Sequence, residues 1–223
     1  MRTHISLVCA ALALGGCGGS TTTPGGTAQD AATQQDVAVT PDVQVTPDAA
    51  PAADVPAART YPAGPYGSSV CRRLEPFSLN KCDGSQWQFQ NDGWSDAAAT
   101  VVIISAGWCV PCQMEAGQIE RELGPYVARG VRVVTVLVQD PNHTAITPTF
   151  CGTWTSRYHL TIPVLMDPAQ ILQPYYPGLA FPGNLIVDAR GVIRYRAYGT
   201  MTGLSSIKTA LDDVLSNPNT CTP

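Results

Sequence analysis

Residues 101–112 read VVIISAGWCVPC and join an apolar run to two closely spaced cysteines. Val101–Ile104 is an unbroken apolar run of branched side chains, typical of a buried strand. Cys109 and Cys112 follow at the start of a helical pattern. A thiol in the first turn of a helix faces unpaired N–H groups and the positive end of the helix dipole, which lowers its pKa. The stretch therefore predicts a redox centre, with Cys109 as the more exposed nucleophile and Cys112 as the resolving thiol.

The residues after the motif alternate between helical and strand patterns. Apolar side chains from Ile119 to Val127 share one helical face, with a kink expected at Gly124-Pro125 and an end at Gly130. Val131–Val138 is almost continuously apolar, as in a central strand. A strand, a helix and a second such strand make a βαβ unit, so the sequence predicts the α/β class.

The remaining elements complete a central mixed sheet flanked by helices. An amino-terminal hairpin is expected around Asp83-Gly84 and a second one across residues 188–191. Between them the sequence predicts a helix over residues 149–160 and a short strand over residues 163–168. A last amphipathic helix is expected over residues 204–215.

The amino terminus reads as a lipoprotein signal. Residues 1–17 hold a basic start, a short apolar stretch and the closing sequence Leu14-Gly15-Gly16-Cys17, which resembles a bacterial lipobox with Cys17 as the lipidated residue. The alternative is an ordinary secretory signal with an incidental cysteine. Gly18 stands where an Asp would favour inner-membrane retention in sorted lipoproteins, so the outer membrane is weakly favoured.

Residues 18–65 are expected to form a disordered tether. They are rich in Pro, Thr, Ala and Asp and contain no aromatic residue before Tyr61. The folded domain is then expected over residues 66–223. With a net charge of −4 and no basic run, the chain carries no signature of nucleic-acid binding.

Eight cysteines fit an oxidising compartment. If Cys9 leaves with the signal, Cys17 takes the lipid and Cys109 pairs with Cys112, four cysteines remain and allow three pairings. Short loop closure favours Cys71–Cys82, which leaves Cys151–Cys221. An alternative role for Cys151 is to relay electrons to or from the main pair.

The order of strand, Trp-Cys-x-x-Cys, helix, and a later proline before a hairpin resembles the thioredoxin superfamily. The Phe-x-Leu hairpin with its Asp-Gly turn (Phe77–Gly84), Glu115 after the motif, and the segment Leu160–Pro168 are similar to its envelope-targeted TlpA/ResA-like branch. The resemblance covers about residues 70–216. It implies a thioredoxin-like fold and thiol-disulfide oxidoreductase activity.

The resemblance also implies roles for particular residues. The peptide bond between Phe181 and Pro182 should be cis, and Pro182 and Trp108 should face the substrate. The alternatives are a plain turn at Pro182 and a purely structural role for Trp108. Glu115 should be a partly buried proton donor or acceptor, or else a solvated helix residue. One departure matters: Ile103 occupies a strand position where many relatives carry an acid.

Other chemistries are less well supported. No second C-x-x-C or nearby His pair completes a zinc site, residue 113 is Gln rather than the His of a haem motif, and no cofactor is expected. Copper chaperones of this fold place three residues between their cysteines, so His143 and His159 give only a weak alternative. The Thr-x-x-Cys pattern of peroxide reduction is absent at this motif.

The sequence therefore predicts a lipid-anchored, periplasm-facing monomer that exchanges disulfides with protein substrates and with an envelope electron donor or acceptor. The competing class is a thioredoxin-fold binding module whose Cys109–Cys112 disulfide is permanent. Ile103 and Ser105 are the residues that favour this second interpretation.

Overall fold

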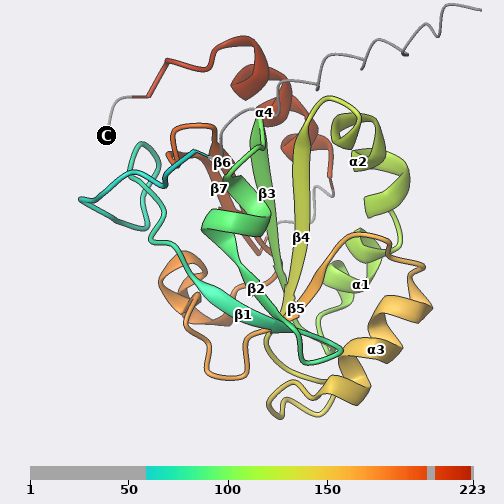
Figure 1. Cartoon of the computed structure of the whole chain (residues 1–223). Coiled ribbons are helices and arrows are strands. Elements are labelled where there is room, and N and C mark those ends of the chain that lie inside the picture. The colour runs from blue at the N-terminus through green and yellow to red at the C-terminus, as the bar shows by residue number, and fades with distance from the viewer. Residues whose placement is uncertain (1–58, 200–203, 222–223) are drawn as a thin grey trace, which may run out of the picture. The chain divides into compact units, whose positions relative to one another are not determined.

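A mixed sheet of seven strands runs through the part of the chain that the computed structural model describes, residues 59–199 and 204–221 (Figure 1). Its strand order is β2-β1-β5-β4-β3-β6-β7. The strands are β1 (Ser78–Lys81), β2 (Gln86–Gln88), β3 (Ala99–Ser105), β4 (Val131–Leu137), β5 (Val164–Met166), β6 (Gly183–Asp188) and β7 (Ile193–Tyr198). The α/β class and the mixed sheet predicted from the sequence are confirmed.

The centre of the sheet is the apolar strand that precedes the cysteine motif. All seven residues of β3 are buried, and β3 pairs parallel with β4 and antiparallel with β6. A strand that is covered on both faces needs apolar side chains throughout, which explains the unbroken run Val101–Ile104. The cysteine motif therefore follows directly after a central, fully buried strand.

Four α-helices flank this sheet: α1 (Val110–Ala116), α2 (Ile119–Val127), α3 (Pro148–Arg157) and α4 (Ser205–Ser216). Of these, α2 packs against β4 and α3 against β5, whereas α4 packs against β6 and β7. The expected position of the helix interruption was wrong. The break falls between α1 and α2 at Gly117-Gln118, and α2 continues through Pro125. Buried Ile119, Leu123 and Tyr126 hold α2 in place on both sides of that proline.

Both predicted hairpins are present. β1 and β2 pair antiparallel around Gly84, which has a φ of +84°, and β6 and β7 pair antiparallel across residues 189–192. Between β2 and β3 lies a segment that sequence patterns did not predict, the short π-helix Phe89–Trp94. Two 3-10 turns, Gln173–Tyr175 and Pro177–Leu179, lead into the Phe181–Pro182 peptide.

The folded region begins before the predicted boundary at residue 66. The Arg59 guanidinium lies over the Trp94 ring and donates hydrogen bonds to the carbonyl oxygens of Trp94, Ser95, Ala97 and Ala189. Tyr61 packs edge-on against Phe89 and Trp94. These contacts fix residues 59–65 on the domain, because a guanidinium with several donors can satisfy loop carbonyls that no strand pairs. The predicted signal (residues 1–17, with Cys17) and residues 18–58 of the predicted tether lie outside the described residues.

The predicted pairing of the structural cysteines was wrong. The structure joins Cys71 to Cys221 and Cys82 to Cys151, instead of Cys71 to Cys82 and Cys151 to Cys221. The entropy cost of closing a loop depends on its length in the unfolded chain. In the folded chain, strand pairing determines which cysteines lie close enough to bond. Cys82 follows β1, which pairs with β5 beside α3 and hence Cys151.

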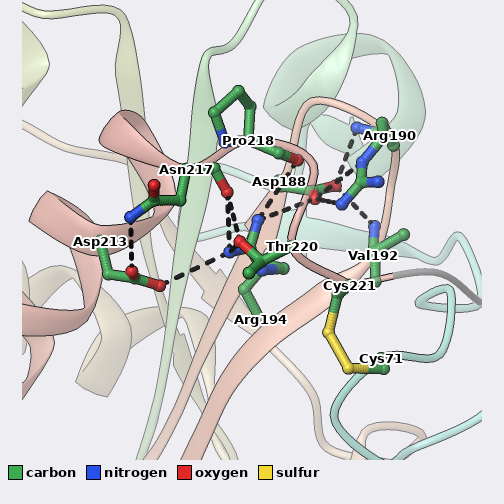
Figure 2. Close-up of a disulfide and its surroundings, with 10 residues drawn as sticks. All are labelled: Cys71, Asp188, Arg190, Val192, Arg194, Asp213, Asn217, Pro218, Thr220 and Cys221. Carbon is green, nitrogen blue, oxygen red and sulfur yellow. Dashed lines mark hydrogen bonds and ion pairs between the residues drawn. A yellow bond between two sulfur atoms is a disulfide. The ribbon is translucent and has the colours of Figure 1, made fainter.

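The other disulfide ties the two ends of the described domain together. Cys71 donates its N–H to the Ile193 carbonyl at 2.8 Å, so its segment lies along the outer edge of β7. The chain after α4 comes back beside that strand and brings Cys221 to Cys71 (Figure 2). In the described part of the chain, no helix has both the length and the apolar character needed to cross a membrane.

Candidate active site

The two motif cysteines form a disulfide at the start of α1. Cys109 is the extended residue that caps the helix, and its Sγ accepts the N–H of Cys112 at 3.2 Å. Pro111 lies in the first turn, where its missing N–H leaves no hydrogen bond unmade. Cys109 is 3% exposed and Cys112 is 0% exposed, so the expected order holds but both residues are buried.

Glu115 lies one turn beyond Cys112 and is 3% exposed. Its carboxylate accepts weak hydrogen bonds from Asn184 Nδ2, with 3.5 Å to each oxygen. No cation of the described residues forms an ion pair with it. Burial therefore raises the pKa of Glu115 to about 7, and the Asn184 hydrogen bonds only partly oppose this shift. The alternative of a solvated helix residue is excluded by this burial.

Asn184 is a site residue that the sequence interpretation missed. It lies on β6 directly opposite Ile103 of β3, so the polar group near the motif comes from the neighbouring strand. Its Oδ1 is buried and has no hydrogen-bond donor among the described residues. The available signal was a polar residue directly before the apolar run Leu185–Val187 of this strand.

Aromatic rings form the wall beside Cys109. The Trp108 ring stacks on the His143 ring, with 4.6 Å between ring centroids, and meets the Phe181 ring edge-on at 5.7 Å. Its indole N–H donates to Gln139 Oε1 at 2.9 Å, and Gln139 Nε2 donates to the His143 carbonyl. The Trp108 side chain is thus held by two aromatic rings and by one hydrogen bond.

Gln139 and His143 were not assigned to this wall from the sequence. Both belong to the loop after β4, and the carboxyl ends of the neighbouring parallel strands β3 and β4 meet at one edge of the sheet. The predicted parallel pairing of these two strands could therefore have placed the loop after β4 beside the motif. His159, the other histidine weighed for metal binding, follows α3 with a φ of +52°.

The Phe181–Pro182 peptide is cis, as the resemblance predicted. Phe181 is buried and reaches Trp108, and Gly183 begins β6 opposite Ile104 at the end of β3. The structure therefore connects the predicted site residues. A disulfide joins Cys109 to Cys112, Glu115 follows on the same helix, and the ring of Trp108 contacts that of Phe181. Among the described residues, no group of three or more His, Cys, Asp or Glu side chains could hold a metal ion.

Comparisons with known proteins agree with this architecture. The chain is 27% identical over 146 residues to the thioredoxin-like protein YneN of Bacillus subtilis, covering 65% of this chain and 80% of YneN. It is 28% identical over 96 residues to the thiol-disulfide oxidoreductase ResA of Geobacillus kaustophilus. That match covers 43% of this chain and about half, 51%, of ResA. A solved DsbF homologue from Corynebacterium diphtheriae superposes with a TM-score of 0.54 at 14% identity, covering 64% of this chain and 86% of that structure.

The fold and the helix-capping disulfide, together with these relatives, define a thioredoxin-like oxidoreductase. More particularly, the chain belongs to the AhpC/TSA family, whose family model matches residues 70–196. The matched range includes the motif, Glu115 and Pro182.

Proposed function

We propose that Cys109 and Cys112 are the redox-active pair of a thiol-disulfide oxidoreductase that acts on protein substrates. The observation that carries the proposal is the position of the disulfide: Cys109 Sγ caps α1 and accepts the Cys112 N–H. The same N–H would stabilise a Cys109 thiolate after reduction. The oxidoreductase names of the ResA relatives support this activity.

The reaction is thiol-disulfide exchange in two steps. The Cys109 thiolate attacks one sulfur of a substrate disulfide, forms a mixed disulfide and releases the other substrate sulfur as a thiolate. The Cys112 thiolate then attacks Cys109 Sγ, which re-forms the Cys109–Cys112 bond and releases the second substrate thiolate. The protein loses two electrons and the substrate gains them. The reverse sequence oxidises a substrate dithiol.

Glu115 supplies or accepts the proton of the buried thiol. Burial disfavours the charged form of its carboxyl group and gives it a pKa of about 7 in the disulfide form, so both of its protonation states are accessible near neutral pH. A protonated Glu115 can give its proton to a departing Cys112 thiolate, whereas an ionised one opposes that thiolate by like charge. Trp108 and Phe181 form the surface that the substrate contacts, with Pro182 beside them.

The cellular setting is part of the same proposal. Residues 1–17 are the lipoprotein signal, Cys17 carries the lipid, and the Pro-rich segment that follows holds the domain away from the membrane. The two further disulfides suit an oxidising, periplasm-facing compartment. An envelope electron donor or acceptor completes the cycle of a monomeric protein, and the outer membrane is favoured as the site of the anchor.

Insulin reduction by the full chain tests the activity. We expect Cys109→Ala to abolish it, because the attacking sulfur is lost, while Arg121→Gln, which changes an exposed side chain on α2, should retain it. Retained insulin reduction in Cys109→Ala would sink the proposal. The direction of electron transfer follows from the reduction potential of the pair. A value of about −270 mV indicates a reductase, and a value of about −120 mV indicates an oxidase.

A binding module with a permanent disulfide is the second candidate. The burial of both motif sulfurs favours it, since Cys109 is only 3% exposed. Alkylation of the chain after mild reduction separates the two functions. Labelling of Cys109 and Cys112 supports the enzyme, whereas a pair that stays unlabelled in an intact fold supports the binding module. A copper chaperone is the remaining alternative, and copper titration of the reduced protein tests it.

A further inference from the structure

A buried amide contacts the carboxyl group of Glu115. Asn184 is the second residue of β6 and lies directly opposite Ile103 of β3. Asn184 is 2% exposed, and Glu115 of α1 is 3% exposed. The Asn184 Nδ2 atom lies 3.5 Å from each carboxylate oxygen of Glu115. The amide and the carboxyl group therefore meet inside the core, where water does not compete for their hydrogen bonds.

The other end of this amide is unsatisfied. Asn184 Oδ1 is buried, and no donor in the described part of the chain reaches it. A buried polar group without a partner costs free energy. The neighbouring positions Ile103 and Leu185–Val187 are apolar and buried, so an apolar side chain would suit this position of the sheet better. Asn184 therefore adds little to the stability of β6, and its contact with Glu115 indicates its role.

The polar groups that the other elements bring to this carboxyl group are neutral. Tyr195 of β7 lies on the same face of the sheet as Asn184. Burial and, to a smaller extent, the Glu115 charge raise the pKa of the Tyr195 phenol, which is hydrogen-bonded to Ser206 of α4 and is therefore neutral near pH 7. On α1, the neighbouring titratable group is the Cys112 thiol of the reduced protein. No ion pair of the described residues includes Glu115, so the donor to its charged form is Asn184.

We propose that Asn184 is a positioning residue for thiol-disulfide exchange: its N–H group stabilises the negative charge that Glu115 acquires when it gives a proton to Cys112. The inference rests on the proposed function of the Cys109–Cys112 pair and adds a residue to its mechanism. A hydrogen-bond donor beside a carboxylate favours the charged form. Asn184 therefore opposes the burial that raises the pKa of Glu115 to about 7, which makes the carboxyl group a better proton donor.

The proton transfer completes the opening of the disulfide. An external thiolate attacks Cys109 Sγ, which breaks the Cys109–Cys112 bond and releases Cys112 as a thiolate. Glu115 lies one turn after Cys112 on α1, and its carboxyl group gives this thiolate a proton. The carboxylate that remains accepts the Asn184 N–H. A second thiolate then attacks the external sulfur of the mixed disulfide and releases the Cys109 thiolate. Two external thiols thus lose the two electrons that the protein disulfide gains.

Two measurements on the full chain test this role. The first is the titration of the Glu115 carboxyl carbon in the oxidised protein by carbon NMR, with the signal assigned by its loss in Glu115→Gln. The second is the initial rate at which dithiothreitol reduces the Cys109–Cys112 bond, expressed per dithiothreitol thiolate at each pH. The reaction is quenched with acid, and Cys109 and Cys112 labelled with a maleimide are counted by mass spectrometry. We expect both midpoints near pH 7 in the wild-type chain, with a lower rate above the midpoint because Glu115 has lost its proton.

Two substitutions remove the amide donor. Asn184→Leu should raise both midpoints by about 0.5 to 1 pH unit, because the carboxylate loses its hydrogen bond. Asn184→Val, which is smaller and suits a strand, should shift them in the same direction, so the effect does not depend on the volume of the new side chain. The matched control is Asn217→Leu, which removes a 2.9 Å contact from an exposed amide to the Asp213 carboxylate and should move neither midpoint.

A double substitution separates this role from a general effect on the core. Glu115→Gln/Asn184→Leu should have the same rate profile as Glu115→Gln alone, because Asn184 acts through the Glu115 carboxyl group. Midpoints that stay unchanged in both Asn184 variants would overturn the inference alone. An Asn184→Leu effect of the same size with and without the carboxyl group would do so too. If dithiothreitol does not reduce the Cys109–Cys112 bond in the folded wild-type chain, the proposed function fails, and the inference fails with it.

Discussion

The Cys109–Cys112 and Cys71–Cys221 disulfides differ in loop length and in the polar contacts around them. Cys109–Cys112 spans a sequence separation of 3 residues, whereas Cys71–Cys221 spans 150. A short loop costs the unfolded chain little entropy, so its closure adds little stability. Reduction of the Cys109–Cys112 bond can therefore occur without a large loss of fold stability, while the long-range bond is suited to holding the domain together.

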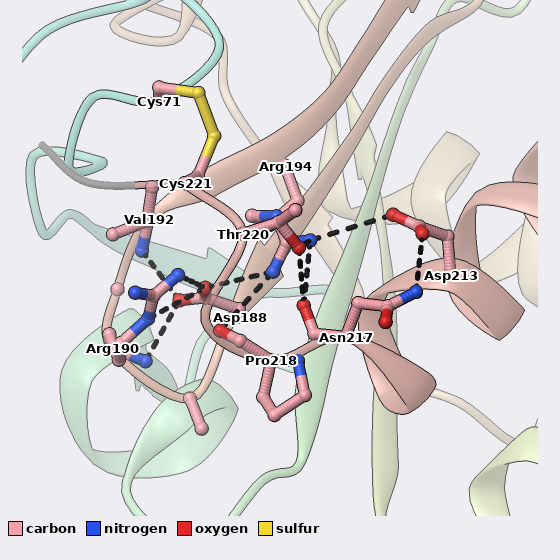
Figure 3. Close-up of polar contacts among 12 residues, drawn as sticks. Cys71, Asp188, Arg190, Val192, Arg194, Asp213, Asn217, Pro218, Thr220 and Cys221 are labelled. Carbon is pink, nitrogen blue, oxygen red and sulfur yellow. Dashed lines mark hydrogen bonds and ion pairs between the residues drawn. A yellow bond between two sulfur atoms is a disulfide. The ribbon is translucent and has the colours of Figure 1, made fainter.

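The buried carboxylates near the two disulfides differ in the same way. Near the motif, the hydrogen bonds of the Glu115 carboxylate within the described part of the chain are the two weak ones from Asn184. Near Cys221, Asp188 is 2% exposed and accepts hydrogen bonds from the N–H groups of Arg190 and Val192 and from the guanidinium groups of Arg190 and Arg194 (Figure 3). The hydrogen bonds and ion pairs of Asp188 fix the position of its carboxylate, whereas the two weak contacts from Asn184 restrain Glu115 much less.

Arg194 connects this carboxylate to the carboxyl-terminal segment. Its side chain is 3% exposed. It donates to the carbonyl oxygens of Asn217 and Pro218 and to Thr220 Oγ1, just before Cys221 (Figures 2 and 3). The carboxyl-terminal segment is thus held by many polar contacts to Arg194, whereas the two contacts from Asn184 to the carboxyl group of Glu115, one turn after Cys112, are long.

The largest expected effect comes from removing the long-range disulfide. Cys71→Ala/Cys221→Ala should lower the free energy of unfolding by about 5 kcal/mol, because the unfolded chain regains the entropy of a loop of this length. Cys109→Ala/Cys112→Ala should lower it by less than about 2 kcal/mol. Denaturant unfolding of the full chain measures both. Equal losses in the two variants would contradict the division of roles.

A smaller effect is expected at Asp188. Asp188→Asn should destabilise the fold by about 3 kcal/mol, since it leaves the buried Arg194 guanidinium without its buried counter-charge. Asp213→Asn is the matched control. Asp213 contacts the same guanidinium, but its side chain is 60% exposed, so its loss should cost less than about 1 kcal/mol. Chemical denaturation compares the two, and similar values would show that burial does not set the strength of this cluster.

The features that the sequence predicted correctly depend on local patterns. The apolar run Val101–Ile104 required a strand with both faces covered, and the position of Cys109 before a helical pattern placed the disulfide at a helix start. The cis peptide at Pro182 came from the family resemblance and not from the residues alone. The hairpin turn at Asp188 was visible because its Asp and Gly residues favour a tight turn.

The features that the sequence did not predict depend on long-range packing. The partner of Cys71 is set by where the chain returns after α4, which no local pattern contains. Asn184 approaches Glu115 only because β6 lies beside β3. Arg59 belongs to the domain because four carbonyl groups from distant loops converge on it. In each case the deciding contact joins segments that are far apart in the sequence.

The last prediction concerns the pH dependence of stability, which the unpaired carboxylate near the motif should control. Folding raises the pKa of Glu115 from 4.5 to about 7, so the folded oxidised chain binds more protons than the unfolded chain between these values. This contribution to stability is therefore fully present below about pH 4.5 and is lost as the pH rises toward 7. We expect it to lower the unfolding free energy by about 2 kcal/mol between pH 5 and pH 7.

Glu115→Gln should remove that slope, because a neutral amide has no proton to lose. Denaturant unfolding of the oxidised chain at several pH values measures it, and Glu75→Gln, which removes an exposed carboxylate, is the control. Subtracting the Glu115→Gln profile from the wild-type profile isolates the contribution of the Glu115 carboxyl group. A difference that stays constant across the range would mean that Glu115 is already ionised at pH 5. The contrast between a paired and an unpaired buried carboxylate would then be lost.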